Sequence, residues 1–445
     1  MKVSEKMKDI LLNKIKKLAS EPKDFLVNPE RDFTRKRKFD LVTLLKFIIC
    51  MEAGSIKDEL YRYFGLNIDN PTASAFVEQR QKLKPEAFEW LFKEFNEATR
   101  DDGSKMKFHG YRLIAIDGSS LPISYDPLDE ETYIKQINKF QEISKGYNAF
   151  HLTASYDLLE HTYDDLIIQG EAYMNENGAF NELVDRYNGE PTIFIADRGF
   201  ESYNSFTHVI KSNNKFLIRI RDIHSKNSIA KGLNLGLDGE FDVDIKRILT
   251  FKNTNEIKAH PEIYRFMSTT SKFDYMNKEN PFYEFECRIV RFKITEDTYE
   301  VIATNLNRNE FNSKIIKELY SMRWGIETSF RELKYAIGMN AFHAKNRNSI
   351  KQEIYARILL YNLSERIIRK VKPKKVKNRK KKYLYQINFT RAFHNTMTYL
   401  KIKDGESPPD IEAIIAKEIE PIRPGRSDPR KIRRPDMVFF TYRFI

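Results

Sequence analysis

Apolar residues recur three and four positions apart near the start of the chain, at Leu41, Leu44, Leu45 and Ile48. This spacing places them on one face of an α-helix, with polar residues on the opposite face. Shorter patterns of the same kind follow up to about residue 100. The pattern therefore predicts a helical domain over residues 1–105.

Glycine and proline residues divide this domain into short helices. Gly54 and Gly65 interrupt the apolar pattern, and Pro85 suits the first turn of a further helix. A basic run at residues 35–38 precedes the helices, and the arrangement is similar to a helix-turn-helix bundle that binds DNA. A plain helical cap on the rest of the protein would show the same pattern. If the domain reads DNA, the polar side chains that it offers to bases are Ser74, Gln79, Arg80 and Gln81.

Further along the chain the pattern changes to short apolar runs that are typical of buried strands. Residues 112–117 and 192–197 are two such runs, and each ends in a carboxylate, Asp117 or Asp197, with a glycine close behind. We expect each strand to end, and a turn to begin, at its aspartate. Further elements are expected as strands at 150–156, 165–169 and 216–220 and a helix at 201–211. Strands mixed with a helix indicate an α/β core over residues 106–221, with its site at strand ends.

The rest of the chain divides into three regions. Residues 222–306 lack a helical period and contain strand-like runs, which predicts a β-rich insertion. Helical character returns over 309–335, and we assign residues 307–345 to the core. Residues 346–445 are expected to form a basic, mainly helical C-terminal region.

The charge of the chain indicates a polyanionic partner. Its 445 residues include 76 Lys and Arg against 63 Asp and Glu, which gives a net charge of +13. Residues 366–382 alone hold eleven basic residues and no acidic one. Cations that neutralise phosphates release bound counterions, so this excess favours a nucleic acid, although a basic enzyme of another kind would have the same composition.

The cysteines and the lengths of the apolar runs indicate in which cellular compartment the protein is expected. The only cysteines, Cys50 and Cys287, lie far apart in the sequence, which excludes a disulfide framework and a zinc knuckle. No apolar run is long enough to span a bilayer, and the first residues lack the features of a signal peptide. We expect a soluble protein of the cytosol with no membrane partner.

Two strands that end in aspartate carry little weight alone, because such a carboxylate often caps a turn or a helix. A third carboxylate changes the picture, since two-metal phosphoryl transfer needs carboxylates that converge on two ions about 3.5–4 Å apart. A predicted helix supplies it, where residues spaced by three, four and seven share one face. These residues are Tyr320, Arg323, Glu327 and Lys334. An exposed helix with ion pairs between Glu327 and nearby arginines would have the same spacing.

The three blocks together resemble a large group of bacterial insertion-sequence transposases of the DDE type. The spacing Tyr-x2-Arg-x3-Glu-x6-Lys is the signature of that group, and the four residues above match it at every position. Residues 114–119 and 195–200 resemble the blocks around its two aspartates. The order of the blocks and the long insertion before the glutamate are also similar. The resemblance covers residues 105–345 well and the flanks loosely.

The resemblance implies a ribonuclease H-like core and a set of residue roles. Two Mg²⁺ ions, which Mn²⁺ can replace, would be held by Asp117, Asp197 and Glu327. Phosphates near the cleaved DNA end would be held by Tyr320, Arg323 and Lys334, and Arg198 is also expected to reach DNA. The enzyme would bind the terminal inverted repeats of its element in double-stranded DNA, cleave the ends and join them to target DNA. Two copies are expected in the synaptic complex, in a bacterial cytosol.

The predicted insertion lacks a tryptophan that members of this group carry. In its best understood members a Trp in the insertion stacks on a base that flips out during hairpin formation, whereas the only tryptophans here are Trp90 and Trp324. Tyr299 offers another aromatic face, so the hairpin step stays open. Two other functions also stay open: a structure-specific nuclease or resolvase on the same core, and a DNA-binding derivative that has lost catalysis.

Overall fold

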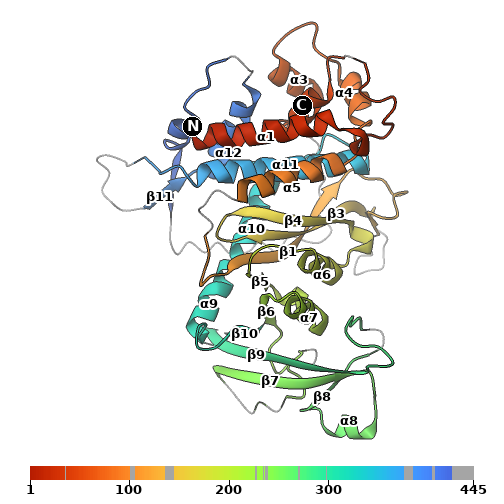
Figure 1. Ribbon diagram of the computed structural model, residues 1–445, viewed down its shortest axis with the longest axis vertical. Helices are drawn as coiled ribbons and strands as arrows, with labels where there is room; N and C mark the ends of the chain where they lie inside the picture. The colour runs from red at the N-terminus through yellow and green to blue at the C-terminus, as the bar shows by residue number, and fades with distance from the viewer. Residues whose placement is uncertain are drawn as a thin grey trace.

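The computed structural model shows a mixed α/β protein in which helices cover one large sheet (Figure 1). It describes residues 1–35, 37–100, 106–135, 145–225, 228–233, 235, 239–268, 271–296, 298–374, 384–402 and 406–422. Residues 375–382 of the basic run and the tail beyond residue 422 lie outside the described residues. Within the described ranges, no helix is both long enough and apolar enough to cross a membrane.

The first hundred residues are helical, as the apolar pattern predicts, and those that the structure describes form five α-helices. They are α1 (Val3–Ser20), α2 (Leu41–Ile49), α3 (Ile56–Phe64), α4 (Ala73–Arg80) and α5 (Glu86–Arg100). The side chains of Asp40, Ser55 and Thr72 each accept a hydrogen bond from the amide three residues further on. Such caps satisfy amides that have no partner inside the helix, so they fix where α2, α3 and α4 begin.

Ten strands form one sheet in the order β2-β3-β1-β5-β6-β10-β9-β7-β8, with β4 beside β3. The strands are β1 (Arg112–Ile123), β2 (Tyr133–Ile134), β3 (Tyr147–Asp157), β4 (Thr162–Gly170), β5 (Thr192–Ala196), β6 (Lys215–Ile220), β7 (Phe241–Thr250), β8 (Tyr264–Phe266), β9 (Phe282–Thr295) and β10 (Thr298–Thr304). β1 pairs parallel with β5, and β5 with β6. The strand-like runs of residues 222–306 become β7 to β10, which extend this same sheet from β6 onward.

Both faces of the central strands are buried. Along β1, Leu113 and Ala115 join one hydrophobic core, while Ile114 and Ile116 join the other. The second core also contains side chains of α6 (Glu176–Asp185) and α7 (Tyr203–Lys211). Because side chains alternate across a strand and both faces are covered, these strands have unbroken apolar sequences.

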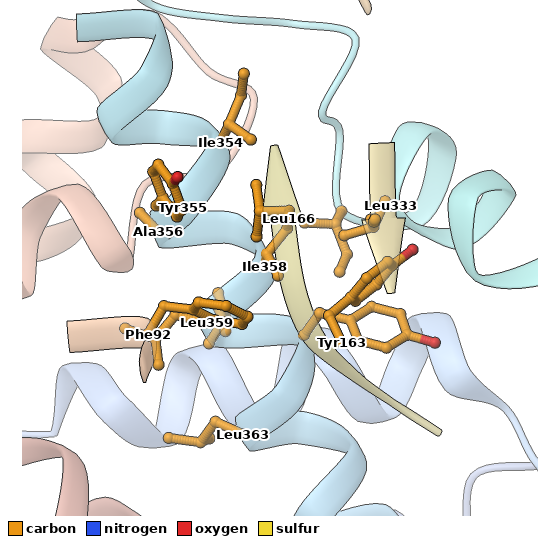
Figure 2. Close-up of a cluster of buried hydrophobic side chains, with 14 of the residues drawn as sticks. Phe92, Tyr163, Leu166, Leu333, Ile354, Tyr355, Ala356, Ile358, Leu359 and Leu363 are labelled. Carbon is orange, nitrogen blue, oxygen red and sulfur yellow. The ribbon is translucent and has the colours of Figure 1, made fainter. Parts of the chain in front are cut away.

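A long central helix, α11 (Arg347–Ile368), connects the N-terminal helices with the sheet. Phe92 of α5 packs on Tyr355 of α11, with ring centroids 6.3 Å apart. Figure 2 shows Tyr163 and Leu166 of β4 close to Ile358, deeper along the same helix. The N-terminal helices, α11 and one face of the sheet therefore share one core.

The remaining described elements are short. They are α8 (Asn255–Ala259), α12 (Phe389–Lys401), α13 (Ile411–Ile415), the 3-10 turns η1 (Lys23–Phe25), η2 (Glu171–Tyr173) and η3 (Arg198–Phe200), and the antiparallel pair β11 (Leu384–Ile387) and β12 (Ile419–Ile422).

The packing against α11 corrects one expectation about DNA reading. Gln79 and Arg80 are only 5% and 3% exposed. The Arg80 guanidinium donates to the side-chain oxygens of Gln352 and Glu353, both at 2.8 Å, and to the backbone oxygen of Ser349. The prediction that Gln79 and Arg80 face bases is therefore wrong, because both side chains are buried. Arg80 is buried against α11, and Gln79 lies beside Lys82, whose amine donates to its Oε1 at 3.3 Å.

The single helix predicted over 309–335 is interrupted twice. α9 (Ser313–Met322) ends before Arg323, and α10 (Trp324–Arg331) follows it. A π-helical turn, η4 (Glu332–Ala336), then ends the run, because the amide of Ile337 donates at 3.0 Å to the carbonyl of Glu332, five residues back. A π-turn holds more residues than an α-turn, so side chains after it no longer follow the face of α10.

We predict that Arg80→Ala lowers the free energy of unfolding by about 3–5 kcal/mol, because it leaves the buried Glu353 carboxylate without its cation. Lys93→Ala, which removes a half-exposed partner of Glu89 on α5, should cost less than about 1 kcal/mol. Urea denaturation measures both. If Arg80→Ala kept full stability and lost DNA affinity instead, Arg80 would be a DNA contact.

Candidate active site

The register between β1 and β5 brings two aspartates side by side at the point where β5 ends. Ile116 of β1 pairs with Ala196 of β5 in the parallel ladder. Asp117 and Asp197 are the residues that follow these two. β5 ends at Ala196, whereas β1 continues to Ile123 in its antiparallel pairing with β3. The expectation of a turn at Gly118 is therefore wrong, since β3 keeps β1 extended beyond Asp117.

Asp197 begins the short turn η3, as a carboxylate after a strand often does. Its Oδ1 accepts a hydrogen bond from the amide of Gly199 at 2.7 Å, which fixes the side chain over the turn. Arg198, the next residue, is exposed. The position leaves one edge of the Asp197 carboxylate and the Arg198 guanidinium open to a ligand.

Glu327 comes from α10, which packs closely on the sheet. A methyl group at Gly325 would lie only 3.0 Å from Cδ2 of Leu158, so glycine permits the close approach of this helix. The hydroxyls of Ser329 and Tyr163 share a hydrogen bond of 2.8 Å and fix α10 against β4. Glu327 thus stands on an element that is anchored to the sheet.

Arg323 joins the first aspartate to this glutamate. Its Nη2 lies 2.6 Å from Oε1 of Glu327, and its Nη1 lies 3.4 Å from Oδ2 of Asp117. The side chain is nearly buried, and its guanidinium carbon lies 4.9 Å from the ring centre of Trp324. Trp324 itself is 58% exposed. A cation therefore holds two of the three predicted carboxylates together.

Burial and neighbouring charges both act on the carboxyl of Asp117. Burial raises the pKa of the Asp117 carboxyl to about 6, and the nearby charges of Asp197 and Glu327 add to the rise. The amide of Gly118 and the guanidinium of Arg323 act in the opposite direction. Asp197 and Glu327 are thus close enough to disfavour the charge of Asp117, as carboxylates that face one site do.

The other two residues of the expected set behave differently. Tyr320 is 4% exposed, and its hydroxyl has no hydrogen-bond partner among the described residues; burial raises its pKa to about 12. Lys334 lies in the π-helical turn, where burial lowers its pKa and Glu171 opposes that effect. Tyr320 lies beside Arg323, whose guanidinium carbon is 5.9 Å from the centre of its ring.

Sequence reasoning missed an ion cluster next to Gly118, on the face of β1 opposite to the Asp117 side chain. His151 of β3 is 4% exposed; its Nε2 lies 2.9 Å from Oε1 of Glu176 and its Nδ1 lies 3.5 Å from Oε2 of Glu171. Burial lowers the pKa of His151, but the two glutamates outweigh it and raise the pKa to about 9. Nothing in the sequence spacing joins these residues, since only the β1–β3 register and the start of α6 bring them together.

The donor set suits a hard divalent cation, although the side chains are not arranged around one. Mg²⁺ prefers carboxylate oxygens, and Asp117, Asp197 and Glu327 supply only these. In the described part of the chain, no three or more His, Cys, Asp or Glu side chains gather tightly enough to hold one ion. At this site the guanidinium of Arg323 contacts the carboxylates of both Glu327 and Asp117.

The aromatic residue considered for base stacking is already in contact with a cation. The guanidinium carbon of Arg291 lies 3.9 Å from the ring centre of Tyr299. One face of the Tyr299 ring is therefore covered. Among the two tryptophans, Trp324 is the one that is widely exposed, and it lies next to Arg323.

Comparison with known proteins gives the family. The family model described as the transposase DDE domain matches residues 108–363, more than half of the chain. No curated protein matches. Among solved structures, the chain is similar to a piggyBac transposase synaptic complex with hairpin DNA, at 12% identity and a TM-score of 0.43, covering 94% of this chain and 84% of that one. By the family match across its central 256 residues, which hold both aspartates and Glu327, the chain belongs to the DDE transposases, enzymes that cleave and join DNA.

Proposed function

We propose that the protein is the transposase of a bacterial insertion sequence with the Tyr-Arg-Glu-Lys signature, built on a ribonuclease H-like core. It binds the terminal inverted repeats of its element, cleaves the ends and joins them to target DNA by two-metal phosphoryl transfer. Asp117, Asp197 and Glu327 are the proposed ligands of two Mg²⁺ ions, which Mn²⁺ can replace.

The observation that carries this proposal is the meeting of three separate chain segments. The β1–β5 register sets Asp117 beside Asp197, and Arg323 connects Asp117 with Glu327 of α10. Carboxylates on a rigid sheet edge and an anchored helix suit a site that must keep its geometry during phosphoryl transfer. When bound, the divalent cations would polarise the scissile phosphate and lower the pKa of the attacking hydroxyl.

The basic and polar neighbours of the carboxylates suit the phosphates of a DNA end. The Arg323 guanidinium can exchange its carboxylate partners for phosphate oxygens, which match the same planar donors. Tyr320 holds a buried hydroxyl that a phosphate oxygen would satisfy. Arg198 is exposed beside Asp197, and we assign a phosphate contact to it and to Lys334 as well.

Recognition of the ends requires a reader apart from the catalytic residues, because phosphate contacts carry no sequence information. We assign it to the helical domain over residues 1–105, with the basic region over 346–445 supporting DNA binding. A surface pocket of the helical domain supports this role through its cationic lining, Arg31, Arg35, Arg37 and Lys82. Two copies are expected in the synaptic complex, one for each transposon end.

A strand-transfer assay with labelled inverted-repeat ends tests the function. A transposase gives joined product in Mg²⁺. Cleaved ends without joining would indicate a nuclease or resolvase, and bound but uncut ends a derivative without catalysis.

We predict that Asp117→Asn, Asp197→Asn and Glu327→Gln each lower end cleavage by at least about 10³-fold, since several kcal/mol of transition-state stabilisation are lost. DNA affinity should change little, because it comes mainly from cations. Glu318→Gln on the exposed face of α9 is the matched control and should cleave normally. Near-normal cleavage by any of the three variants would remove that residue from the site.

We predict that Arg323→Gln has opposite effects on metal binding and on cleavage. Removal of the guanidinium frees Asp117 and Glu327, so the affinity of the DNA-free protein for Mn²⁺ should rise about tenfold. End cleavage should fall, because the phosphate loses a bidentate partner. Electron paramagnetic resonance of free Mn²⁺ gives the affinity, and an unchanged or lower value would show that Arg323 does not compete with the cation.

A further inference from the structure

We propose that α4 reads base edges in the major groove of the transposon ends through its outward face, which comprises Ser74, Val77, Glu78 and Gln81. The inference rests on the proposed function, since it names the side chains by which the helical domain would recognise an end. It is carried by the anchoring of α4, which leaves this face without a partner, and by a group of cations beside the helix.

The inner face of α4 is fixed by two side chains one turn apart. The ring of Phe76 is fully buried, and its centre lies 4.9 Å from that of Phe47 on α2 and 5.7 Å from that of Phe39. Arg80 is equally inaccessible and lies 2.8 Å from the carboxylate of Glu353 on α11. These contacts set the rotation of α4 about its own axis, so they determine which residues face outward.

The outward face carries the side-chain types that base recognition uses. Its four members are spaced by three, four and seven positions and are all exposed, Val77 by 38%. Within the described residues, the polar side chains of this face have no hydrogen-bond or ion-pair partner. In the major groove Gln pairs with adenine, Glu accepts from cytosine, Ser suits several bases and an apolar side chain contacts the methyl group of thymine.

The length and the position of α4 also suit a groove. The helix has eight residues, and Gln81 after it keeps helical backbone angles. Eight residues span about 12 Å, which is close to the width of the major groove. Figure 1 shows α4 beside α3 at the end of the molecule opposite to α8, so the sheet does not stand between this helix and an approaching duplex.

A group of cations lies beside the C-terminal half of α4. We call it the cationic rim, and it consists of the basic residues that line one surface pocket with Gln79, namely Arg31, Arg35, Arg37 and Lys82. The three arginines are exposed, and the only acidic residue in the same lining is Glu30. Cations at the side of a reading helix can hold the DNA backbone and so fix its register, while the helix contacts the bases.

An exposed apolar residue could also belong to a contact with another protein. Val77 lies on the outward face, and Ile68, in the loop before α4, is fully exposed. The excess of positive charge in the cationic rim favours DNA, because phosphates are the partners that such a cluster neutralises best. A protein contact is therefore an outcome of the test that would overturn the inference.

The test measures binding of the full-length protein to a duplex of the element's inverted repeat and to a scrambled duplex of equal length. Fluorescence anisotropy without divalent cations gives both affinities, so the result does not depend on catalysis. Gln81→Ala should weaken binding to the inverted repeat about tenfold and leave binding to the scrambled duplex unchanged. Asn13→Ala, which removes an exposed amide side chain from α1, is the matched control and should change neither affinity.

Two further variants separate base reading from backbone contact. Arg31→Ala should weaken binding to both duplexes alike and lower the slope of log affinity against log salt concentration by about 0.9. Val77→Ser should lower the preference for the inverted repeat and leave the salt slope unchanged, because it removes no charge. Thermal unfolding of each variant shows whether the fold is kept.

The outcomes separate the inference from the proposed function. If Gln81→Ala and Val77→Ser both keep the full preference for the inverted repeat, or weaken both duplexes equally, α4 does not read bases and the inference is overturned. A change of oligomeric state in sedimentation without DNA, with the preference kept, would make this face a protein contact. If the unaltered protein binds both duplexes equally, the proposed recognition of the ends is wrong and the inference falls with it.

Discussion

The parallel pairing of β1 with β5 is the constraint on which the site depends. It aligns Ile116 with Ala196 and so makes Asp117 and Asp197 neighbours where β5 ends. Burial raises the pKa of Asp117, and the negative charge of Asp197 adds to the rise. The arrangement is tolerated because the strands are fixed by cores on both faces, so the repulsion cannot be relieved by movement of the backbone.

Cationic side chains balance the negative charge of the carboxylates on and near β1. Arg323 lies between Asp117 and Glu327, and His151 lies between Glu171 and Glu176. Each cation is largely buried and each pairs with two carboxylates, so charge is balanced locally. Removal of one member would leave the others buried without compensation, which costs far more than the loss of an exposed ion pair. Each of the two ion groups is therefore held together as a unit.

Helix α11 decides how the remaining parts of the chain contact this network. It packs on β4 and α5, binds Arg80 through Glu353, and supports the π-helical turn through the hydrogen bond from Tyr361 to Glu332. The helical domain at the start of the chain is thus packed on the half that carries the candidate site.

The sequence by itself determined the local elements and their chemistry. The apolar runs before Asp117 and Asp197 predict β1 and β5, and the helical spacing predicts α2 and α3, because periodicity and capping act over a few residues. The motif around Arg323 and Glu327 indicates the family for the same reason, since its spacing is local. These features can be predicted without knowing which residues distant in the sequence contact them.

Only the tertiary structure decided where these elements meet. β1 continues past Gly118 because β3 pairs with it, and Arg80 turns inward because α11 receives it. The β1–β3 register brings His151 over Gly118. Each outcome depends on a contact between segments that are far apart in the chain, and a register or a buried ion pair of that kind leaves no trace in local spacing.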